Sequence, residues 1–142
     1  MNIKLLIVDD EEEILSTLSR FFALHDFDVA TANSAAGALK IIEKEKINIA
    51  LMDINMPEMN GIDLLSRIKK RDFSIQVIMM TAYSTFDKTL RSLEMGAVDY
   101  ILKPFDKLDD VLGLVNESVR RLKRWQKNLL ESVKLGREKK QQ

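Results

Sequence analysis

The stretch "IALMDINMPEMNG", residues 49–61, runs from an apolar segment into an acid and then into a turn. Ile49 to Met52 are all apolar, and the carboxylate of Asp53 follows immediately. Pro57 and the pair Asn60-Gly61 are residues typical of turns. A short apolar run bounded by turn residues is typical of a strand covered on both faces of a parallel sheet. The stretch therefore predicts a central strand that ends in a carboxylate.

Four further apolar runs surround this strand, and helical patterns separate them. The runs cover residues 3–8, 27–32, 75–80 and 98–102. Nearly continuous apolar character in the first and third of these indicates central strands, whereas alternation in the other two indicates positions near an edge. Apolar residues recur at helical spacing in the segments 14–22, 35–42, 62–68 and 90–95 and from Leu108 onward. The alternation predicts an α/β domain with a five-stranded parallel sheet and right-handed crossovers.

Composition narrows the class of protein. With 142 residues and 46% hydrophobic content, the chain fits one domain with a real core and a short extension. It contains no cysteine, so a disulfide framework and a thiolate metal site are both excluded, which suits a cytoplasmic protein. The apolar run near the N-terminus is too short for a signal peptide, and no stretch approaches the ~20 apolar residues of a membrane span.

The net charge of zero hides an uneven distribution. Residues 1–117 contain 13 Lys/Arg and 20 Asp/Glu, whereas residues 118–142 contain 9 Lys/Arg and 2 Asp/Glu. An acidic body with a basic tail suggests that the tail has a separate role.

Four of the five predicted strands end in polar residues. Asp9 and Asp10 follow the first run, Asp53 the third, Thr81 the fourth and Lys103 the fifth. The carboxyl ends of parallel strands share one edge of the sheet, and this edge is where open α/β sheets form their sites. We therefore expect these side chains to lie close together.

Three carboxylates and one lysine at one edge favour a divalent cation. The acids repel each other unless positive charge lies among them, and Lys103 supplies only one. Oxygen ligands without histidine or cysteine suit Mg²⁺, or Mn²⁺. A carboxylate can also act as a nucleophile on phosphorus, and a metal, an ammonium group and a hydroxyl suit phosphoryl transfer.

Taken singly, each of these residues has a simpler interpretation. The pair Asp9-Asp10 could cap a helix, and Asp53 could be a turn residue. Thr81 could cap the following helix, and Lys103 could be a solvated surface lysine. Their joint occurrence at successive strand ends favours the site.

The motifs at the strand ends match a known family. "VDD" (8–10), "MDINMPEMNG" (52–61), "TA" (81–82), "DY" (99–100) and "KP" (103–104) stand in the order and spacing of response-regulator receiver domains of two-component signalling. The resemblance covers about residues 1–122. It implies a doubly wound, flavodoxin-like (CheY-like) sheet in the order 2-1-3-4-5 with helices on both faces.

The resemblance also implies roles for the site residues. Asp53 would accept a phosphoryl group from a partner's phosphohistidine, with Mg²⁺ as the cofactor. Asp10 would bind the metal directly and Asp9 mainly through water, while Asn55 would offer its backbone carbonyl. Lys103 would pair with Asp53 and then with the phosphoryl oxygens.

A second group of residues would relay or frame the change. Thr81 would hydrogen-bond the phosphoryl group, and Tyr100 would swing inward, altering the face made by the fourth helix, the fifth strand and the fifth helix. The Lys103-Pro104 bond would be cis, and Pro57 and Gly61 would frame the metal site. Asn55 and Tyr83 occupy positions that tune hydrolysis of the aspartyl phosphate in this family.

Partners follow from the same resemblance. A sensor histidine kinase or a phosphotransfer protein would donate the phosphoryl group, and a homodimer could form through the face just described or through the C-terminal helix. The expected activity is signalling, not catalysis on small molecules, and no membrane partner is expected. The basic tail is weak evidence for nucleic acid, because no helix-turn-helix follows it, so direct DNA binding is not expected.

The last helix is predicted to extend beyond the globular domain. Leu108, Val115, Leu122 and Leu129 are spaced by seven, and Val111, Ser118, Trp125 and Ser132 form the complementary series. A helix from Leu108 to Val133 would be about 39 Å long. Residues 123–142 are thus expected to be a basic helical extension or linker, with a frayed end as the alternative.

Three rival functions fit parts of the pattern. A Mg²⁺-dependent phosphohydrolase usually needs a second carboxylate two residues after its nucleophile, and this chain has Asn55 there. A flavin-binding module would need a phosphate loop after the first strand, where "DDEEE" would repel a phosphate. A degenerate receiver that serves only for interaction would not retain the complete site.

Overall fold

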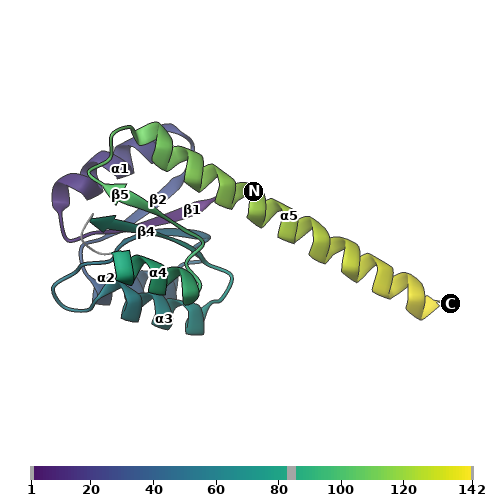
Figure 1. Ribbon diagram of the computed structural model, residues 1–142. Helices are drawn as coiled ribbons and strands as arrows, with labels where there is room; N and C mark the ends of the chain where they lie inside the picture. Colours follow the sequence, from purple (N-terminus) through teal and green to yellow (C-terminus); the bar gives the residue numbers. More distant parts are fainter. Residues whose placement is uncertain (1, 83–85, 142) are drawn as a thin grey trace.

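The computed structural model describes residues 2–82 and 86–141, and within these ranges five strands alternate with five helices (Figure 1). The strands are β1 (Lys4–Val8), β2 (Asp28–Ala32), β3 (Ile49–Asp53), β4 (Gln76–Ala82) and β5 (Asp99–Lys103). The helices are α1 (Glu12–Leu24), α2 (Ala35–Lys44), α3 (Gly61–Arg71), α4 (Phe86–Glu94) and α5 (Leu108–Gln141).

All strand pairs are parallel, and the sheet order is β2-β1-β3-β4-β5. The predicted fold class and strand order are therefore confirmed. The alternating runs 27–32 and 98–102 form the two edge strands, as their patterns indicated. The stretch that opens at Ile49 forms β3, which lies at the centre of the sheet with all five residues buried.

Helices cover both faces of the sheet. In Figure 1, α1 and α5 lie on one face and α2, α3 and α4 on the other. Successive side chains of a strand point to opposite faces, so β1 divides its residues between two cores. Leu5 and Ile7 pack in the core with α1 and α5, whereas Leu6 and Val8 pack in the core with α2 and α3.

The helix α4 departs from the pattern that the sequence suggested. The spacing of Leu90, Leu93 and Met95 predicted an apolar buried face. Leu93 and Met95 are half-buried against the core, but Leu90 is 48% exposed. The buried positions of α4 are instead occupied by Thr89 and Ser92, among residues 87–94 whose burial the structure describes.

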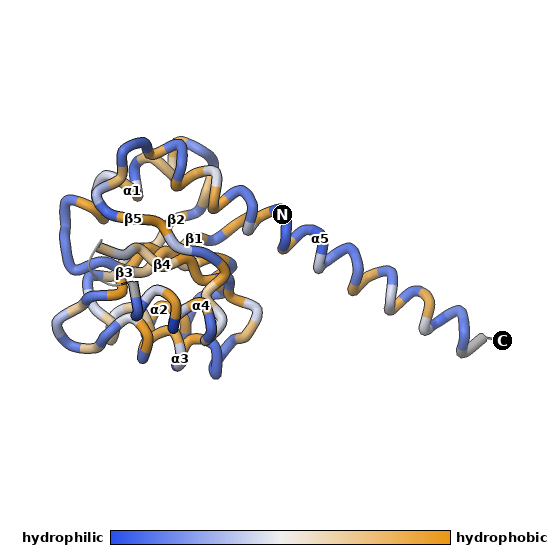
Figure 2. Tube along the Cα trace, viewed as in Figure 1, coloured by the Kyte–Doolittle hydropathy of each residue, from blue (hydrophilic) through white to orange (hydrophobic). Residues whose placement is uncertain are grey.

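The helix α5 begins at the predicted residue, Leu108, and continues past Val133 to Gln141, so residues 123–141 are helical. Figures 1 and 2 show its C-terminal half extending away from the domain, with hydrophobic and hydrophilic residues alternating along it. Large apolar side chains are exposed on this half: Trp125, Leu129, Leu130, Val133 and Leu135.

Buried polar contacts fix α5 where it crosses the sheet. The side chain of Gln76, at the start of β4, donates from Nε2 to the carbonyl of Ser118 at 3.1 Å. Arg121 donates from Nη1 to Gln76 Oε1 at 2.7 Å. These contacts hold the helix just before it leaves the domain. Among the described residues, no helix is both long and apolar enough to cross a lipid bilayer.

Candidate phosphoacceptor and metal site

Three aspartates from two strand ends meet at the carboxyl edge of the sheet. Asp9 and Asp10 follow β1, and Asp53 is the last residue of β3. Each offers a carboxylate oxygen within 4.8 Å of the others. Asp9 and Asp53 are buried, whereas Asp10 is exposed. The structure thus brings together the three acids that the sequence placed at this edge.

Lys103, the last residue of β5, lies between two of these acids. Its Nζ is 2.6 Å from Asp9 Oδ2, 3.4 Å from Asp53 Oδ2 and 3.7 Å from Glu11 Oε1. Its side chain is only 12% exposed. The simpler interpretation of Lys103 as a solvated lysine is therefore wrong. The peptide bond between Lys103 and Pro104 is cis.

Local hydrogen bonds orient both buried carboxylates. Asp9 Oδ1 accepts from the backbone N–H of Glu11 at 2.9 Å, and Asp53 Oδ1 accepts from the backbone N–H of Asn55 at 3.0 Å. The turn-like interpretation of Asp53 is thus partly right, whereas the cap interpretation of Asp9-Asp10 is wrong, because the N-cap position of α1 is Glu11 and its side chain makes no capping hydrogen bond. In each case the second oxygen, Oδ2, is the one that faces Lys103.

The loop after β3 is closed by Gly61. A Cβ atom at this position would lie 2.6 Å from Ile54 Cα and 2.7 Å from the carbonyl oxygen of Asp53, so only glycine fits here. The side chain of Asn60 caps α3 by accepting from the backbone N–H of Asp63 at 2.9 Å. Pro57 is exposed within the same loop. The turn therefore returns the chain tightly beside the phosphoacceptor candidate.

Burial and pairing shift the ionisation of the cluster in opposite directions. Burial raises the pKa of Asp9, and the hydrogen bond to Lys103 only partly offsets this. Burial likewise raises the pKa of Asp53, against the hydrogen bond from Asn55 and the charge of Lys103. Burial alone would lower the pKa of Lys103, but its hydrogen bond to Asp9 and the charge of Asp53 hold that pKa above its usual value.

The acid cluster fits a magnesium ion by charge and by spacing. One lysine leaves two negative charges of the three aspartates without a partner within the cluster. Oxygen ligands about 2.1 Å from Mg²⁺ lie at most about 4.2 Å apart, close to the separations in the cluster. The three carboxylates thus form an acidic pocket that suits a divalent cation such as Mg²⁺.

The remaining predicted residues lie on β4, on β5 and in the loop after β3. Thr81 is buried near the end of β4 and pairs in register with Leu102 of β5. Tyr100 lies on β5 and is 40% exposed. The side chain of Asn55 accepts from Lys88 Nζ at 3.2 Å, which links the loop after β3 to α4. Tyr83 lies outside the described residues.

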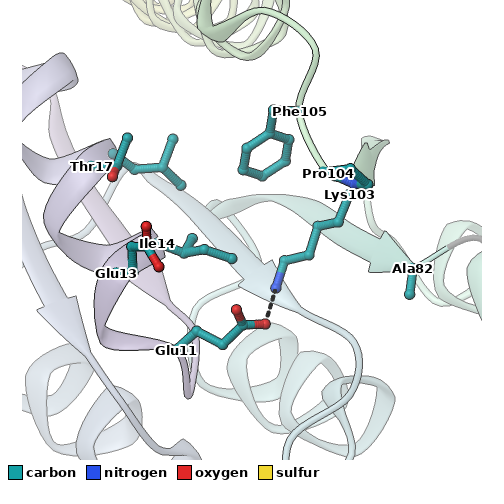
Figure 3. A pocket seen from close by; sticks show the side chains of 9 residues that line it. Glu11, Glu13, Ile14, Thr17, Ala82, Lys103, Pro104 and Phe105 are labelled. Carbon is teal, nitrogen blue, oxygen red and sulfur yellow. Dashed lines mark ion pairs between the residues drawn. The ribbon is translucent and has the colours of Figure 1, made fainter.

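A cleft of about 490 Å³ opens beside Lys103 (Figure 3). Its walls come from α1 and from the segment after β5, and they are mostly apolar. The lining residues are Glu11, Glu13, Ile14, Thr17, Leu18, Ala82, Lys103, Pro104 and Phe105. Figure 3 shows Lys103 extending past this cleft toward Glu11.

Comparison with known proteins agrees with this fold and site. Residues 5–115 match the response regulator receiver domain family. The chain is 38% identical over 117 residues to the sporulation initiation phosphotransferase F of Bacillus subtilis, covering 82% of this chain and 94% of that protein. It is also 38% identical over 117 residues to the regulatory protein AtoC of Escherichia coli, covering 82% of this chain. It spans only 25% of the length of AtoC.

A solved receiver domain from Clostridium thermocellum has the same architecture. The two superpose with a TM-score of 0.81 at 29% identity, covering 87% of this chain and 98% of that one. Fold and site define a doubly wound signalling domain with an acidic cluster at its carboxyl edge. The chain belongs to the response-regulator receiver domain family and thus to two-component signalling.

Sequence reasoning missed the polar contacts of α4. Thr89 donates from Oγ1 to Thr81 Oγ1 at 3.1 Å, and both residues are buried. The available signal was the spacing of Thr89 and Ser92, which places two hydroxyls on one helical face. The apolar residues Leu90 and Leu93 instead indicated that the buried face of the helix would be apolar.

Proposed function

We propose that Asp53 is the phosphoacceptor of a phosphorylation-dependent switch. The observation that carries this proposal is the meeting of Asp9, Asp10 and Asp53 around one carboxyl edge, with Lys103 beside them. Asp9, Asp10 and Asp53, with the backbone carbonyl of Asn55, would hold Mg²⁺. When bound, the ion would neutralise negative charge on the phosphoryl oxygens.

The transfer itself needs one nucleophile and well-placed charge. A carboxylate oxygen of Asp53 forms a bond to phosphorus as the P–N bond to the donor histidine breaks, and the electron pair of that bond stays on the imidazole nitrogen. Lys103 then pairs with the new phosphoryl oxygens. Positioning and charge neutralisation account for most of the rate of such transfers.

The response would spread through Thr81 and Tyr100. The Thr81 hydroxyl donates a hydrogen bond to the phosphoryl group, and Tyr100 turns inward on the neighbouring strand. The register supports such coupling, because Thr81 pairs with Leu102, two residues after Tyr100. The face formed by α4, β5 and α5 would then present a different surface to an output partner or domain.

The donor partner would be a sensor histidine kinase or a phosphotransfer protein in the cytoplasm. The cleft beside Lys103 supports an approach over α1, because apolar side chains such as Ile14 and Phe105 lie next to the charged site. Apolar contact area beside a reactive group can hold a partner while its histidine reaches Asp53.

Residues 1–122 would form the receiver and residues 123–142 a basic helical extension that dimerises or leads to a further domain. The exposed apolar residues Trp125, Leu129 and Val133 support this proposal. They continue the helical face on which Val115 and Leu122 are buried.

The chain would catalyse only its own phosphorylation and dephosphorylation. The position two residues after Asp53 is Asn55, whose side chain contacts Lys88, so the second carboxylate of a phosphohydrolase is replaced by an amide. A chromogenic phosphoester tests this rival directly, and turnover that requires Asp53 would favour the hydrolase.

Labelling with acetyl phosphate tests the main proposal. The wild-type chain with Mg²⁺ should gain an acid-labile phosphoryl group, and Asp53→Asn should gain none. Asp63→Asn, an exposed acid in the first turn of α3, serves as the matched control and should label normally. Labelling of Asp53→Asn at the wild-type rate contradicts the assignment.

A further inference from the structure

The buried face of α4 carries hydroxyl groups where a helix usually carries aliphatic side chains. Thr89 is 5% exposed and Ser92 is fully buried, whereas the neighbouring Leu90 is 48% exposed. Leu93 is only half-buried. The attachment of α4 to the sheet therefore depends on polar contacts more than its sequence suggests.

The contacts of these hydroxyls lead to Thr81. Thr89 Oγ1 donates to Thr81 Oγ1 at 3.1 Å, and Thr81 Oγ1 donates to the carbonyl of Ala82 at 3.1 Å. Ser92 Oγ donates to the backbone carbonyl of Thr89 at 2.7 Å. The hydroxyl of Thr89 thus joins α4 to the residue that the proposed function assigns to the phosphoryl group.

A hydroxyl has one proton and two acceptor lone pairs. Thr81 can accept from Thr89 and donate its proton elsewhere at the same time. To donate to a phosphoryl group on Asp53, it must take its proton away from Ala82 and turn toward the site. Such a turn would carry Thr81 Oγ1 away from the donor on α4 and would weaken the bond to Thr89.

We propose that Thr89 is a positioning residue that holds the Thr81 hydroxyl in its unphosphorylated position and transmits its release to α4. This inference rests on the proposed function of Asp53 and Thr81. In the resting protein the Thr89 bond keeps α4 on the sheet. When Thr81 turns to the phosphoryl group, the bond is lost and α4 loosens.

Binding of beryllofluoride with Mg²⁺, a mimic of the phosphoryl group, tests the first half. Thr89→Val removes the hydroxyl that donates to Thr81, with little change in shape, so binding no longer involves the loss of that hydrogen bond. We therefore expect Thr89→Val to bind beryllofluoride more tightly than the wild type does. The expected factor is roughly five-fold, which corresponds to the typical net strength of one hydrogen bond. Thr89→Ser restores the hydroxyl and should bind as the wild type does. Ser92→Ala is the matched control, because its hydroxyl contacts the Thr89 carbonyl and should not affect affinity.

Amide hydrogen exchange in α4 tests the second half. In the wild type, exchange of the amides of residues 89–94 should speed up when beryllofluoride binds. In Thr89→Val, exchange should already be fast without it and should change little on binding. If Thr89→Val does not fold, the wild-type measurement alone decides, since unchanged α4 exchange on binding contradicts the proposal.

The outcomes separate this inference from the proposed function. If the wild type neither binds beryllofluoride nor is labelled by acetyl phosphate, the assignment of Asp53 is wrong. If the wild type binds it and Thr89→Val binds with the same affinity, Thr89 has only a structural role and the inference is overturned. A loss of thermal stability in Thr89→Val with unchanged affinity overturns the inference in the same way.

Discussion

The ammonium group of Lys103 lies 2.6 Å from Asp9 Oδ2 but 3.4 Å from Asp53 Oδ2. The lysine is therefore held chiefly by Asp9 and less closely by Asp53, the proposed phosphoacceptor. This leaves Asp53 oriented by its backbone contact with Asn55 and only loosely paired. If Asp53 accepts a phosphoryl group as proposed, Lys103 would be close enough to move to the new phosphoryl oxygens.

Replacing Lys103 with methionine should separate transfer from metal binding. We expect Mg²⁺ binding to persist, because the aspartates remain, and acetyl phosphate labelling to slow by roughly 10²-fold, a typical loss for one charged donor. The free energy of unfolding of the metal-free variant should fall by at most about 3–5 kcal/mol, because a buried ion pair loses one partner. Lys46→Met, which removes a 3.0 Å surface pair with Asp72, is the control and should cost less than about 1 kcal/mol. Loss of Mg²⁺ binding in Lys103→Met would mean that the lysine organises the metal site.

Asp53→Asn should stabilise the metal-free protein at neutral pH. Burial raises the pKa of Asp53 in the folded state above 3.8. Between pH 3.8 and the raised pKa of the folded state, the folded state therefore binds more protons than the unfolded state. The free energy of unfolding falls as pH rises through that window. The asparagine variant avoids this loss, so its Tm should exceed that of the wild type by a few degrees.

Chemical denaturation of the wild type and of Asp53→Asn, from about pH 3 to 8, measures this effect. The difference between their free energies of unfolding should grow as pH rises. Asp72→Asn provides the opposite sign, because contacts with Ser74 and Lys46 outweigh burial and lower the pKa of Asp72. Its stabilising contribution is present above 3.8 and is lost as pH falls through the folded value, so that variant should be less stable at neutral pH. Equal stabilities of wild type and Asp53→Asn across the range would contradict the first expectation.

The sequence predicted the sheet and the site because both depend on local signals. Each apolar run is bounded by turn residues, and parallel strands bring their carboxyl ends together, so Asp9, Asp53 and Lys103 could be placed from the sequence alone. Side-chain partners across elements could not be predicted in the same way. The choice of Asp9 over Asp53 by Lys103 depends on distances set by tertiary packing. The burial of Thr89 instead of Leu90 depends on how α4 is rotated about its axis.

Gly61→Ala should be strongly destabilising. The added Cβ would meet Ile54 Cα at 2.6 Å and the carbonyl of Asp53 at 2.7 Å, both of which are backbone atoms that cannot move aside independently. We expect a loss of more than about 2 kcal/mol in the free energy of unfolding, together with weaker Mg²⁺ binding, because the strain acts on the backbone of Asp53, the proposed phosphoacceptor. Gly113→Ala is the control: nothing lies within 4 Å of its Cβ position, and alanine favours the helix by about 0.5–1 kcal/mol. Urea denaturation measures both, and a neutral Gly61→Ala would show that the loop relaxes freely.

Thr17→Arg should impair transfer from a protein donor without affecting the chemistry at Asp53. Thr17 is exposed on α1 and lines the cleft beside Lys103, so a long charged side chain would obstruct that cleft at little cost in folding. Labelling by acetyl phosphate should stay near the wild-type rate, while labelling by a phosphorylated histidine phosphotransfer protein should fall. Ser16→Arg adds the same charge at an exposed position outside the cleft lining and should leave both rates unchanged. Equal rates for both variants with the protein donor would place the partner elsewhere.

Leu129→Asp should abolish self-association through the extension, whereas Leu135→Asp should not. At about 100° per residue, Leu129 shares a face with Trp125 and Leu122, while Leu135 points away from that face. Both leucines are exposed, at 66% and 58%, so neither change should cost much folding energy.

The extension is strongly basic, and screening its repulsion should make dimers stronger as salt rises. Sedimentation of the wild type, the two variants and a chain ending at Leu122, each at low and high salt, measures this. A monomeric wild type under every condition, phosphorylated or not, would leave the extension as a link to another domain.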